Sequence, residues 1–230
     1  MTKRTIILHY HLFKNAGTSL DRILKDNFPD QWVTQEFSGR NNTAQVQDWI
    51  LSQPDAVAFS SHTMMGPVPQ IDGVRIVSLI FLRDPIARIR SAYRFERTQE
   101  SDNFGAVLAK VTDFEGYVRV RLSLPHDRQC RNFQTSRLAS MVPGSEPELE
   151  RATKALKRLS VVGRVEDFSG AMIKLKAALD GFFPEFKFNP VHANRSVAPG
   201  SATDRLGDIG TMLIDANQDD LMLADSLNRA

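Results

Sequence analysis

The sequence predicts an α/β fold with a central parallel sheet flanked by helices. Short apolar runs typical of buried strands alternate with segments whose apolar residues recur at helical spacing. The strongest strand, Val74–Leu82, is nearly continuous in β-branched and apolar residues, as expected of a central parallel strand. With 230 residues, 42% of them hydrophobic, the chain can bury a real core, and we expect a single domain over residues 1–230.

The first third of the chain is expected to hold two strands and two helices. Thr5–Tyr10 is a short apolar run, and the segment after it carries Leu20, Ile23, Leu24 and Phe28 on one helical face. We expect a second helix at 43–53, a second buried strand at 56–60, and a loop marked by glycine and prolines at 61–70.

Helical patterns dominate the remainder. Pro85 follows the strand that ends at Leu82 and suits the first turn of a helix. Ser145, Pro147 and Glu148 together have the composition of a capped helix start. Further elements are expected as helices within 104–140 with a break near 125, a strand at 160–165, a helix at 168–179, a loop-rich stretch from 186 to 210, and a helix at 217–227.

The tight turn between the first strand and the first helix is the most informative segment. Free backbone N–H groups and the positive end of a helix dipole converge at such a turn, which makes it an anion site. Small residues let the backbone approach a phosphate, and the lysine adds a full positive charge. The residues predicted to form this site are Lys14, Asn15, Ala16, Gly17, Thr18 and Ser19.

This turn differs from the P-loop of nucleotide hydrolases, which reads Gly-x-x-x-x-Gly-Lys-Ser/Thr. Here Lys14 precedes Gly17, and no Gly-Lys-Ser/Thr occurs in the chain. The sequence therefore predicts a bound phosphate without magnesium-dependent ATP hydrolysis.

A second anion site is predicted where the strand 74–82 ends. Arg83 emerges at the C-terminal edge of the sheet, where ligands bind in open α/β folds. A guanidinium there can hold a phosphate through two parallel hydrogen bonds, and Ser91 on the following helix can donate a hydroxyl to the same phosphate. The other arginines of this helix, Arg88, Arg94 and Arg97, are assigned to a solvated face without a ligand role.

Charge and cysteine content exclude several classes of protein. The 29 basic and 27 acidic residues leave a net charge of +2, too small for a general nucleic-acid-binding surface. One cysteine, Cys130, allows no internal disulfide and fits a reducing, cytoplasmic compartment. No apolar run approaches the ~18 residues of a membrane span, and we interpret the N-terminus as a core strand rather than a signal peptide. We expect neither nucleic-acid nor membrane partners.

Both predicted anion sites resemble elements of the sulfotransferases. His11–Ser19 is similar to their 5'-phosphosulfate loop, His-x-Pro-Lys-[TN]-[AG]-Gly-Thr-Ser, with Phe13 in place of the usual proline. Leu82–Tyr93 matches in full their 3'-phosphate element, Leu-Arg-[DN]-Pro-x-x-Arg-x-x-Ser-x-Tyr. The resemblance implies a P-loop-NTPase-like sulfotransferase fold. It also implies 3'-phosphoadenosine 5'-phosphosulfate (PAPS) as co-substrate, with its 5'-phosphate on the loop and its 3'-phosphate on Arg83 and Ser91.

Three further segments extend the resemblance to about residue 196. Asn132–Thr135 is similar to a stretch in bacterial and carbohydrate-type members, and Val162–Phe168 is similar to a strand-to-helix joint of the family. His192–Ser196 looks like the loop that closes over the nucleotide, which makes Arg195 a predicted contact.

Sulfuryl transfer to an alcohol needs a base and a cation beside the leaving oxygen. His62 follows the second strand and is predicted to project from the sheet edge that carries Lys14 and Arg83. The heparan sulfate 2-O-sulfotransferase branch, which the chain resembles here in outline, has a histidine base at this place. Lys14 is expected to stabilise the leaving group as well as bind it. Glu36 and Glu96 stay open as alternative bases.

This chemistry requires no metal. His9 and His11 share a strand face, but the sequence shows no third ligand nearby and no His-Glu-x-x-His, so a zinc site is not predicted. Cys130 lacks a thiolate-activating motif and is expected to be buried or inert.

The favoured interpretation is a sulfotransferase that moves a sulfuryl group from PAPS to a hydroxyl of a carbohydrate or glycoconjugate by in-line displacement. Its second product would be adenosine 3',5'-bisphosphate. Two alternatives stay open: an ATP-dependent small-molecule kinase, and a non-catalytic member that binds a nucleotide or a glycan. The sequence leaves the acceptor and the oligomeric state undefined.

Overall fold

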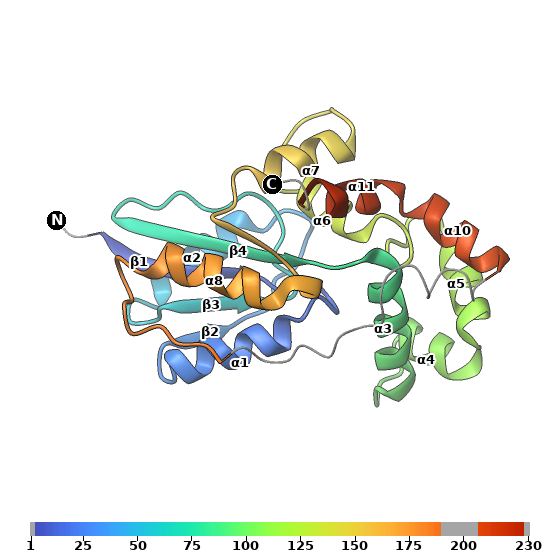
Figure 1. Ribbon diagram of the computed structural model, residues 1–230, viewed down its shortest axis with the longest axis horizontal. Coiled ribbons are helices and arrows are strands. Elements are labelled where there is room, and N and C mark those ends of the chain that lie inside the picture. The colour runs from blue at the N-terminus through green and yellow to red at the C-terminus, as the bar shows by residue number, and fades with distance from the viewer. Residues whose placement is uncertain (1–2, 190–206, 228–230) are drawn as a thin grey trace. The chain divides into compact units, whose positions relative to one another are not determined.

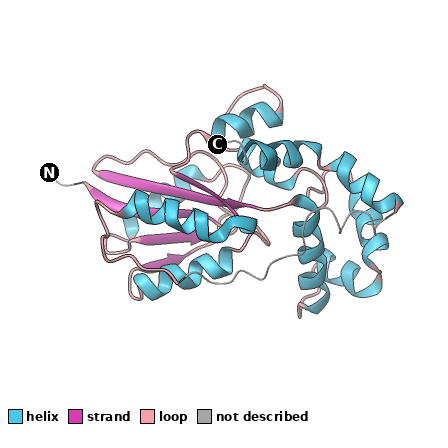
Figure 2. Cartoon of the chain, in the orientation of Figure 1, coloured by secondary structure: helices cyan, strands magenta, loops and turns pink. Residues whose placement is uncertain are grey.

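A five-stranded parallel sheet with the order β2-β3-β1-β4-β5 is the centre of the fold, which confirms the predicted α/β class (Figures 1 and 2). The computed structural model describes residues 3–189 and 207–227. The strands are β1 (Arg4–Tyr10), β2 (Trp32–Thr34), β3 (Ala58–Ser61), β4 (Val74–Leu82) and β5 (Val161–Arg164).

The described residues divide into two compact units. The first comprises the residues up to 82 and from 137 to 189, and it contains the whole sheet. The second comprises 83–136 and the residues from 207 onward, and it is helical. The expectation of a single domain stays a prediction. No helix within 3–189 or 207–227 combines the length and apolar character needed to cross a bilayer.

Helices fill the rest of both units. Those of the first unit are α1 (Gly17–Asn27), α2 (Thr43–Ser52), α7 (Glu148–Leu156), the short 3-10 helix η1 (Val165–Asp167) and α8 (Phe168–Leu179). Those of the second are α3 (Pro85–Thr98), α4 (Phe104–Val111), α5 (Phe114–Ser123), α10 (Asp208–Ala216) and α11 (Gln218–Leu227). Helix α6 (Phe133–Ala139) spans the boundary between the units.

The sheet of the first unit is covered by helices on both faces. Ile7 and Phe81 point to the face that α1 and α8 cover, and the Phe81 ring stacks on Phe168 at 5.1 Å between centroids. Phe59 points to the opposite face, where the ring of Trp49 on α2 meets it edge-on at 4.9 Å. Figure 1 shows α8 in front of the strands. Because side chains alternate along a strand, this two-sided burial explains the nearly continuous apolar runs.

Besides the short η1, the described residues contain β2 and α10, which were absent from the sequence prediction. β2 has only three residues and lies at the edge of the sheet, too short for a period to be visible. α10 lies partly in the stretch expected to be loop, and its Ile209 and Leu213 are buried in the core of the second unit. The predicted capped start at Ser145 is also wrong in detail, because α7 begins at Glu148 and Pro147 occupies the capping position without a side-chain hydrogen bond.

The second unit has a core of its own. Tyr117 and Cys130 are fully buried among apolar residues of α3, α4, α5 and α10. Burial raises the pKa of the Cys130 thiol to about 12, so the expectation that this cysteine is buried is confirmed. Arg121 pairs with Glu96 at 2.9 Å and with Asp127 at 2.7 Å, which supplies the compensation that a buried charge needs.

A glycine allows α8 to lie close to β5. A Cβ placed on Gly163 would lie 2.6 Å from the Cβ of Ala171 and 2.8 Å from the Phe81 ring. We therefore expect Gly163→Ala to lower the free energy of unfolding by ~1–3 kcal/mol through overpacking, measured by urea denaturation. Gly181→Ala is the matched control, because nothing lies within 4 Å of its added Cβ. Equal stability of the two variants would contradict this account of the β5–α8 contact.

Candidate functional site

The turn between β1 and α1 has a backbone suited to an anion. Lys14 and Ala16 adopt left-handed conformations with φ of 64° and 58°, which are costly for residues that carry a Cβ. Helix α1 begins at Gly17, and no described side chain caps its first turn. The N–H groups at the start of α1 and its dipole are therefore directed at the space beyond the turn, the arrangement that binds phosphate in other proteins.

Asn15 anchors this turn to the sheet. Its side chain is 1% exposed, and Nδ2 donates a hydrogen bond of 2.7 Å to the carbonyl of Phe81 on β4. Thr18 and Ser19 are exposed at the start of α1, and Lys14 is half-buried. Asn15 and Gly17 are therefore the buried members of the predicted phosphate site, and the other four residues are half-buried or exposed.

Strand register brings three histidines together beside the turn. β1 pairs with β3 so that His9 lies opposite Ser60, and the hydrogen bond from the His11 amide to the Ser61 carbonyl (3.0 Å) continues the pairing. Because paired residues of parallel strands share a face, His11 comes beside His62. The two rings stack at 3.8 Å between centroids, and His9 stacks on His11 at 5.0 Å.

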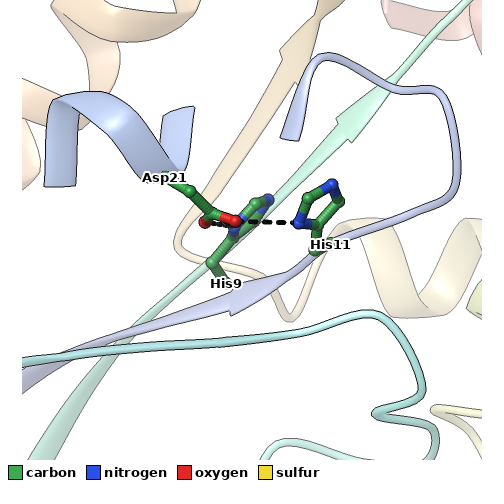
Figure 3. Close-up of side chains that lie close together, drawn as sticks. All are labelled: His9, His11 and Asp21. Atoms are coloured by element: carbon green, nitrogen blue, oxygen red, sulfur yellow. Dashed lines mark hydrogen bonds and ion pairs between the residues drawn. The ribbon is translucent and has the colours of Figure 1, made fainter. Parts of the chain in front are cut away.

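Asp21 on α1 joins two of these rings (Figure 3). Its Oδ1 lies 3.0 Å from Nδ1 of His9, and its Oδ2 lies 3.0 Å from Nδ1 of His11. Burial alone would raise the pKa of the Asp21 carboxyl, but the hydrogen bonds from His11 and His9 outweigh it and hold the pKa well below its ordinary value. Asp21 is therefore a carboxylate, and both Nδ1 atoms carry the hydrogens that it accepts.

The same three side chains correct part of the sequence argument about metals. No third ligand near His9 and His11 was expected, but Asp21, one helical turn after Gly17, lies beside both rings. The donor atoms of the three side chains lie within 4.8 Å of one another, close enough to surround an ion. Each Nδ1 is already engaged with the carboxylate, so the set satisfies itself through hydrogen bonds.

A second carboxylate holds His62, which immediately follows β3. Oε1 of Glu36 lies 2.9 Å from Nδ1 of His62, and Oε2 accepts hydrogen bonds from the amide (2.9 Å) and hydroxyl (2.7 Å) of Thr63. Burial would raise the pKa of Glu36, but the hydrogen bonds from Thr63 and His62 lower it overall. An ionised Glu36 places the hydrogen of His62 on Nδ1 and leaves the Nε2 lone pair available. Both side chains are half exposed.

The loop that carries His62 is also fixed from α6. A guanidinium nitrogen of Arg137 donates to the carbonyls of His62 (2.7 Å) and Met64 (3.1 Å). Burial lowers the pKa of Arg137 to about 10, with Glu36 acting in the opposite direction. His62 is therefore oriented through both its ring and its backbone.

The second predicted anion element lies in the second unit and is held by a glutamine. The amide of Arg83 donates to Oε1 of Gln134, and Nε2 of Gln134 donates back to the Arg83 carbonyl, both at 2.8 Å. Buried Asp220 of α11 accepts from the amides of Gln134 (3.1 Å) and Thr135 (2.7 Å). Asp84 then caps α3 by accepting from Ala87 at 2.7 Å. Asp220 was not predicted as part of this element, because it lies far along the chain from Arg83.

The remaining predicted residues are placed as follows. Ser91 is half-buried on α3, in the same unit as Arg83. The turn 14–19 and His62 belong to the first unit, where the His11 ring connects them. Arg195 and the segment His192–Ser196 lie outside the described residues.

The structure overturns one assignment and weakens one alternative. Arg88 is not on a solvated face: it is 0% exposed, donates to the Gln129 carbonyl, and lies over the Phe133 ring at 4.5 Å. The burial of Arg88 was not predicted, because the sequence alone does not distinguish a buried arginine on a helix from one on the surface. The Glu96 carboxylate accepts hydrogen bonds from Arg121 and, at 2.7 Å, from the hydroxyl of Tyr117. A carboxylate held in this way is poorly suited to act as a base that receives a proton from a substrate.

Comparisons with known proteins give one clear relative. No protein-family model matches the sequence. An uncharacterized protein of Archaeoglobus fulgidus is 43% identical over 207 residues, which cover 85% of this chain and 81% of that protein. Among solved structures, mouse sulfotransferase SULT7A1 complexed with PAP aligns with a TM-score of 0.41 and 14% identity over 82% of this chain. This chain spans 61% of the mouse protein's length, and the likeness is too low to support an argument about activity.

The buried histidine His9 predicts a pH-dependent stability. Burial lowers its pKa, and this effect exceeds the opposing one of Asp21. The unfolded chain therefore binds a proton that the folded chain excludes, so acid favours unfolding. We expect the free energy of unfolding to fall between pH 7 and pH 5, with His9 contributing up to ~1.4 kcal/mol per pH unit.

The test compares the slopes of variants. His9→Asn keeps an N–H near the Nδ1 position but does not titrate, so its stability should depend less steeply on pH in chemical denaturation. His126→Asn is the control, because His126 is exposed. Identical slopes for wild type and His9→Asn would show that His9 is not a neutral buried group.

Proposed function

We propose that this chain, which belongs to the same family as the uncharacterized Archaeoglobus fulgidus protein, is a PAPS-dependent sulfotransferase. It would transfer a sulfuryl group to a hydroxyl of a carbohydrate or glycoconjugate, in the cytoplasm, where its single cysteine suits a reducing setting. The proposal rests on the sequence elements that resemble this family and on the chemistry of the groups around the turn 14–19.

The observation that carries the proposal is the pairing of an anion-binding turn with a carboxylate–histidine pair on adjacent strands. The turn after β1 offers uncapped N–H groups and Lys14 to a phosphate. The loop after β3 offers the Nε2 lone pair of His62, with Nδ1 held by Glu36 at 2.9 Å. An anion site and an oriented base next to each other are what group transfer from a phosphorylated donor to an alcohol requires.

A second anion element supports a donor with two phosphate groups. The backbone of Arg83 is fixed by Gln134, and α3 starts directly after it with Asp84 as its cap. Ser91 follows on the same helix. The order of the two elements along the chain matches the 5' and 3' phosphates of adenosine 3',5'-bisphosphate in the family that the sequence resembles.

The residues around the turn would then share the transfer step. Nε2 of His62 takes the proton of the acceptor hydroxyl as the new oxygen–sulfur bond forms. The bond between sulfur and the bridging oxygen of the 5'-phosphate breaks, and Lys14 stabilises the negative charge that develops on that oxygen. Glu36 stabilises the imidazolium form of His62 through Nδ1. The two products are the sulfated acceptor and adenosine 3',5'-bisphosphate.

The first test is donor binding. We expect adenosine 3',5'-bisphosphate at ~100 times its dissociation constant to stabilise the protein by about 2.7 kcal/mol, measured as a raised melting temperature. AMP should stabilise it less, and both Lys14→Ala and Arg83→Ala should lose the effect. A shift that appears only with ATP and magnesium would favour a kinase, and no shift with any nucleotide would contradict a nucleotide-dependent activity.

The second test separates chemistry from binding. With a panel of mono- and oligosaccharide acceptors, we expect His62→Ala to lower the rate of adenosine 3',5'-bisphosphate release from PAPS by ~10²–10⁴-fold. Glu36→Gln should lower it by ~10–100-fold, because the orientation of the ring is lost. Both variants should bind the bisphosphate as wild type does, whereas Lys14→Ala should lose binding and turnover together. His126→Ala is the control, and full activity in His62→Ala would refute its role as the base.

A further inference from the structure

One nitrogen beside the turn has no role in the chemistry described so far. His11 is 5% exposed, and its Nδ1 is committed to Asp21 at 3.0 Å. Its Nε2, on the edge of the ring away from the carboxylate, has no hydrogen-bond partner among the residues that the structure describes (Figure 3). A buried imidazole with one oriented and one open nitrogen is a group prepared for a ligand.

The open nitrogen lies against the start of α1. A Cβ placed on Gly17 would lie 2.0 Å from Nε2 of His11, so the ring occupies the space that any side chain at Gly17 would need. Gly17 is the first residue of α1, and no described side chain caps that end. Nε2 is therefore adjacent to the N–H groups on which a phosphate or sulfate would be held.

Two anionic groups would face the two nitrogens of the His11 ring when an anion is bound at the start of α1. Asp21 of α1 faces Nδ1 as a carboxylate, and the anion would face Nε2. His9 and His62 cover the ring from β1 and from the loop after β3, and Lys14 belongs to the same turn. A protonated His11 would donate one hydrogen bond to each of two anionic groups, the strongest arrangement open to an imidazole.

We propose that His11 is a further ligand of the donor's anionic end: as an imidazolium held on Asp21 through Nδ1, it donates Nε2–H to a 5'-phosphate or sulfonate oxygen at the start of α1. This rests on the proposed function, and it adds a binding residue beyond the N–H groups and Lys14. The hydrogen bond requires one proton from solvent, which is released again when the nucleotide leaves.

The test uses two nucleotides that differ only at the 5' end. Adenosine 3',5'-bisphosphate carries the group that His11 would contact, and adenosine 3'-phosphate lacks it. His11→Asn keeps an N–H that can reach Asp21 but has nothing at the Nε2 position. We expect this variant to bind the bisphosphate at least ~10-fold more weakly than wild type, as for loss of a charge-assisted hydrogen bond, and to bind the 3'-phosphate unchanged. His126→Asn is the matched control on an exposed histidine.

A measurement on the wild-type protein guards against a variant that fails to fold. Calorimetric titration in buffers of different ionisation enthalpy should show uptake of about one proton with the bisphosphate above pH 7 and none with the 3'-phosphate. Histidine ¹⁵N spectra should show a proton gained at Nε2 of one ring, assigned to His11 by its loss in His11→Asn.

Each remaining outcome decides against one specific claim. If wild type binds neither nucleotide, the proposed function fails. If wild type binds the bisphosphate but His11→Asn weakens both nucleotides equally, or neither, then His11 is structural and this inference is overturned. Stoichiometric binding of Zn²⁺ that is lost in His9→Asn and in His11→Asn would also overturn it, because both Nδ1 atoms would then belong to a metal.

Discussion

The parallel register of β1 with β3 is the constraint on which the rest of the site depends. It sets His9 opposite Ser60 and carries the pairing on to Ser61, so that His11 and His62 project side by side from one face. A slip of β1 by one residue would turn His9 and His11 to the face covered by α2 and separate them from His62. The packing of both strands agrees with this register, because Ile7 packs in the core on the side of α1 and α8 and Phe59 packs against Trp49 of α2 on the other side. The core of the sheet therefore positions the polar groups.

Two carboxylates complete the arrangement from outside the strands that carry the rings. Asp21 reaches the histidines of β1 from α1, and Glu36, in the segment after β2, reaches the histidine that follows β3. Each carboxylate accepts at Nδ1 and so determines which nitrogen of each ring is free. In the second unit Asp220 performs the same kind of task with backbone amides, since it holds Gln134, which frames Arg83. In each case an acidic side chain orients the groups that it contacts.

Most of the sheet, the turn between β1 and α1 and the helix that starts at Pro85 could be predicted from the sequence, because the period of apolar residues and a strand–turn–helix pattern are local properties. The partners of the candidate residues could not. In the sequence Asp21 looks like any polar residue on an amphipathic helix. Only the folded structure shows that this position of α1 lies beside His9. Asp220 and Gln134 are 86 residues apart, and only the folded chain brings them together. Arg88 is buried by Gln129 and Phe133, neither of which is visible from its own helix.

The close fit of the His11 ring to Gly17 links two positions that belong to different parts of the turn. The absent side chain of Gly17 is the space in which the imidazole lies, with the ring only 2.0 Å from any added Cβ. Natural variation at these positions should therefore be correlated in size. Relatives with a larger residue at position 17 would need a smaller one at position 11, and a glycine at 17 would persist for as long as a ring is kept beneath it. A side chain at position 17 is excluded by sterics while the ring is present, before selection on activity acts.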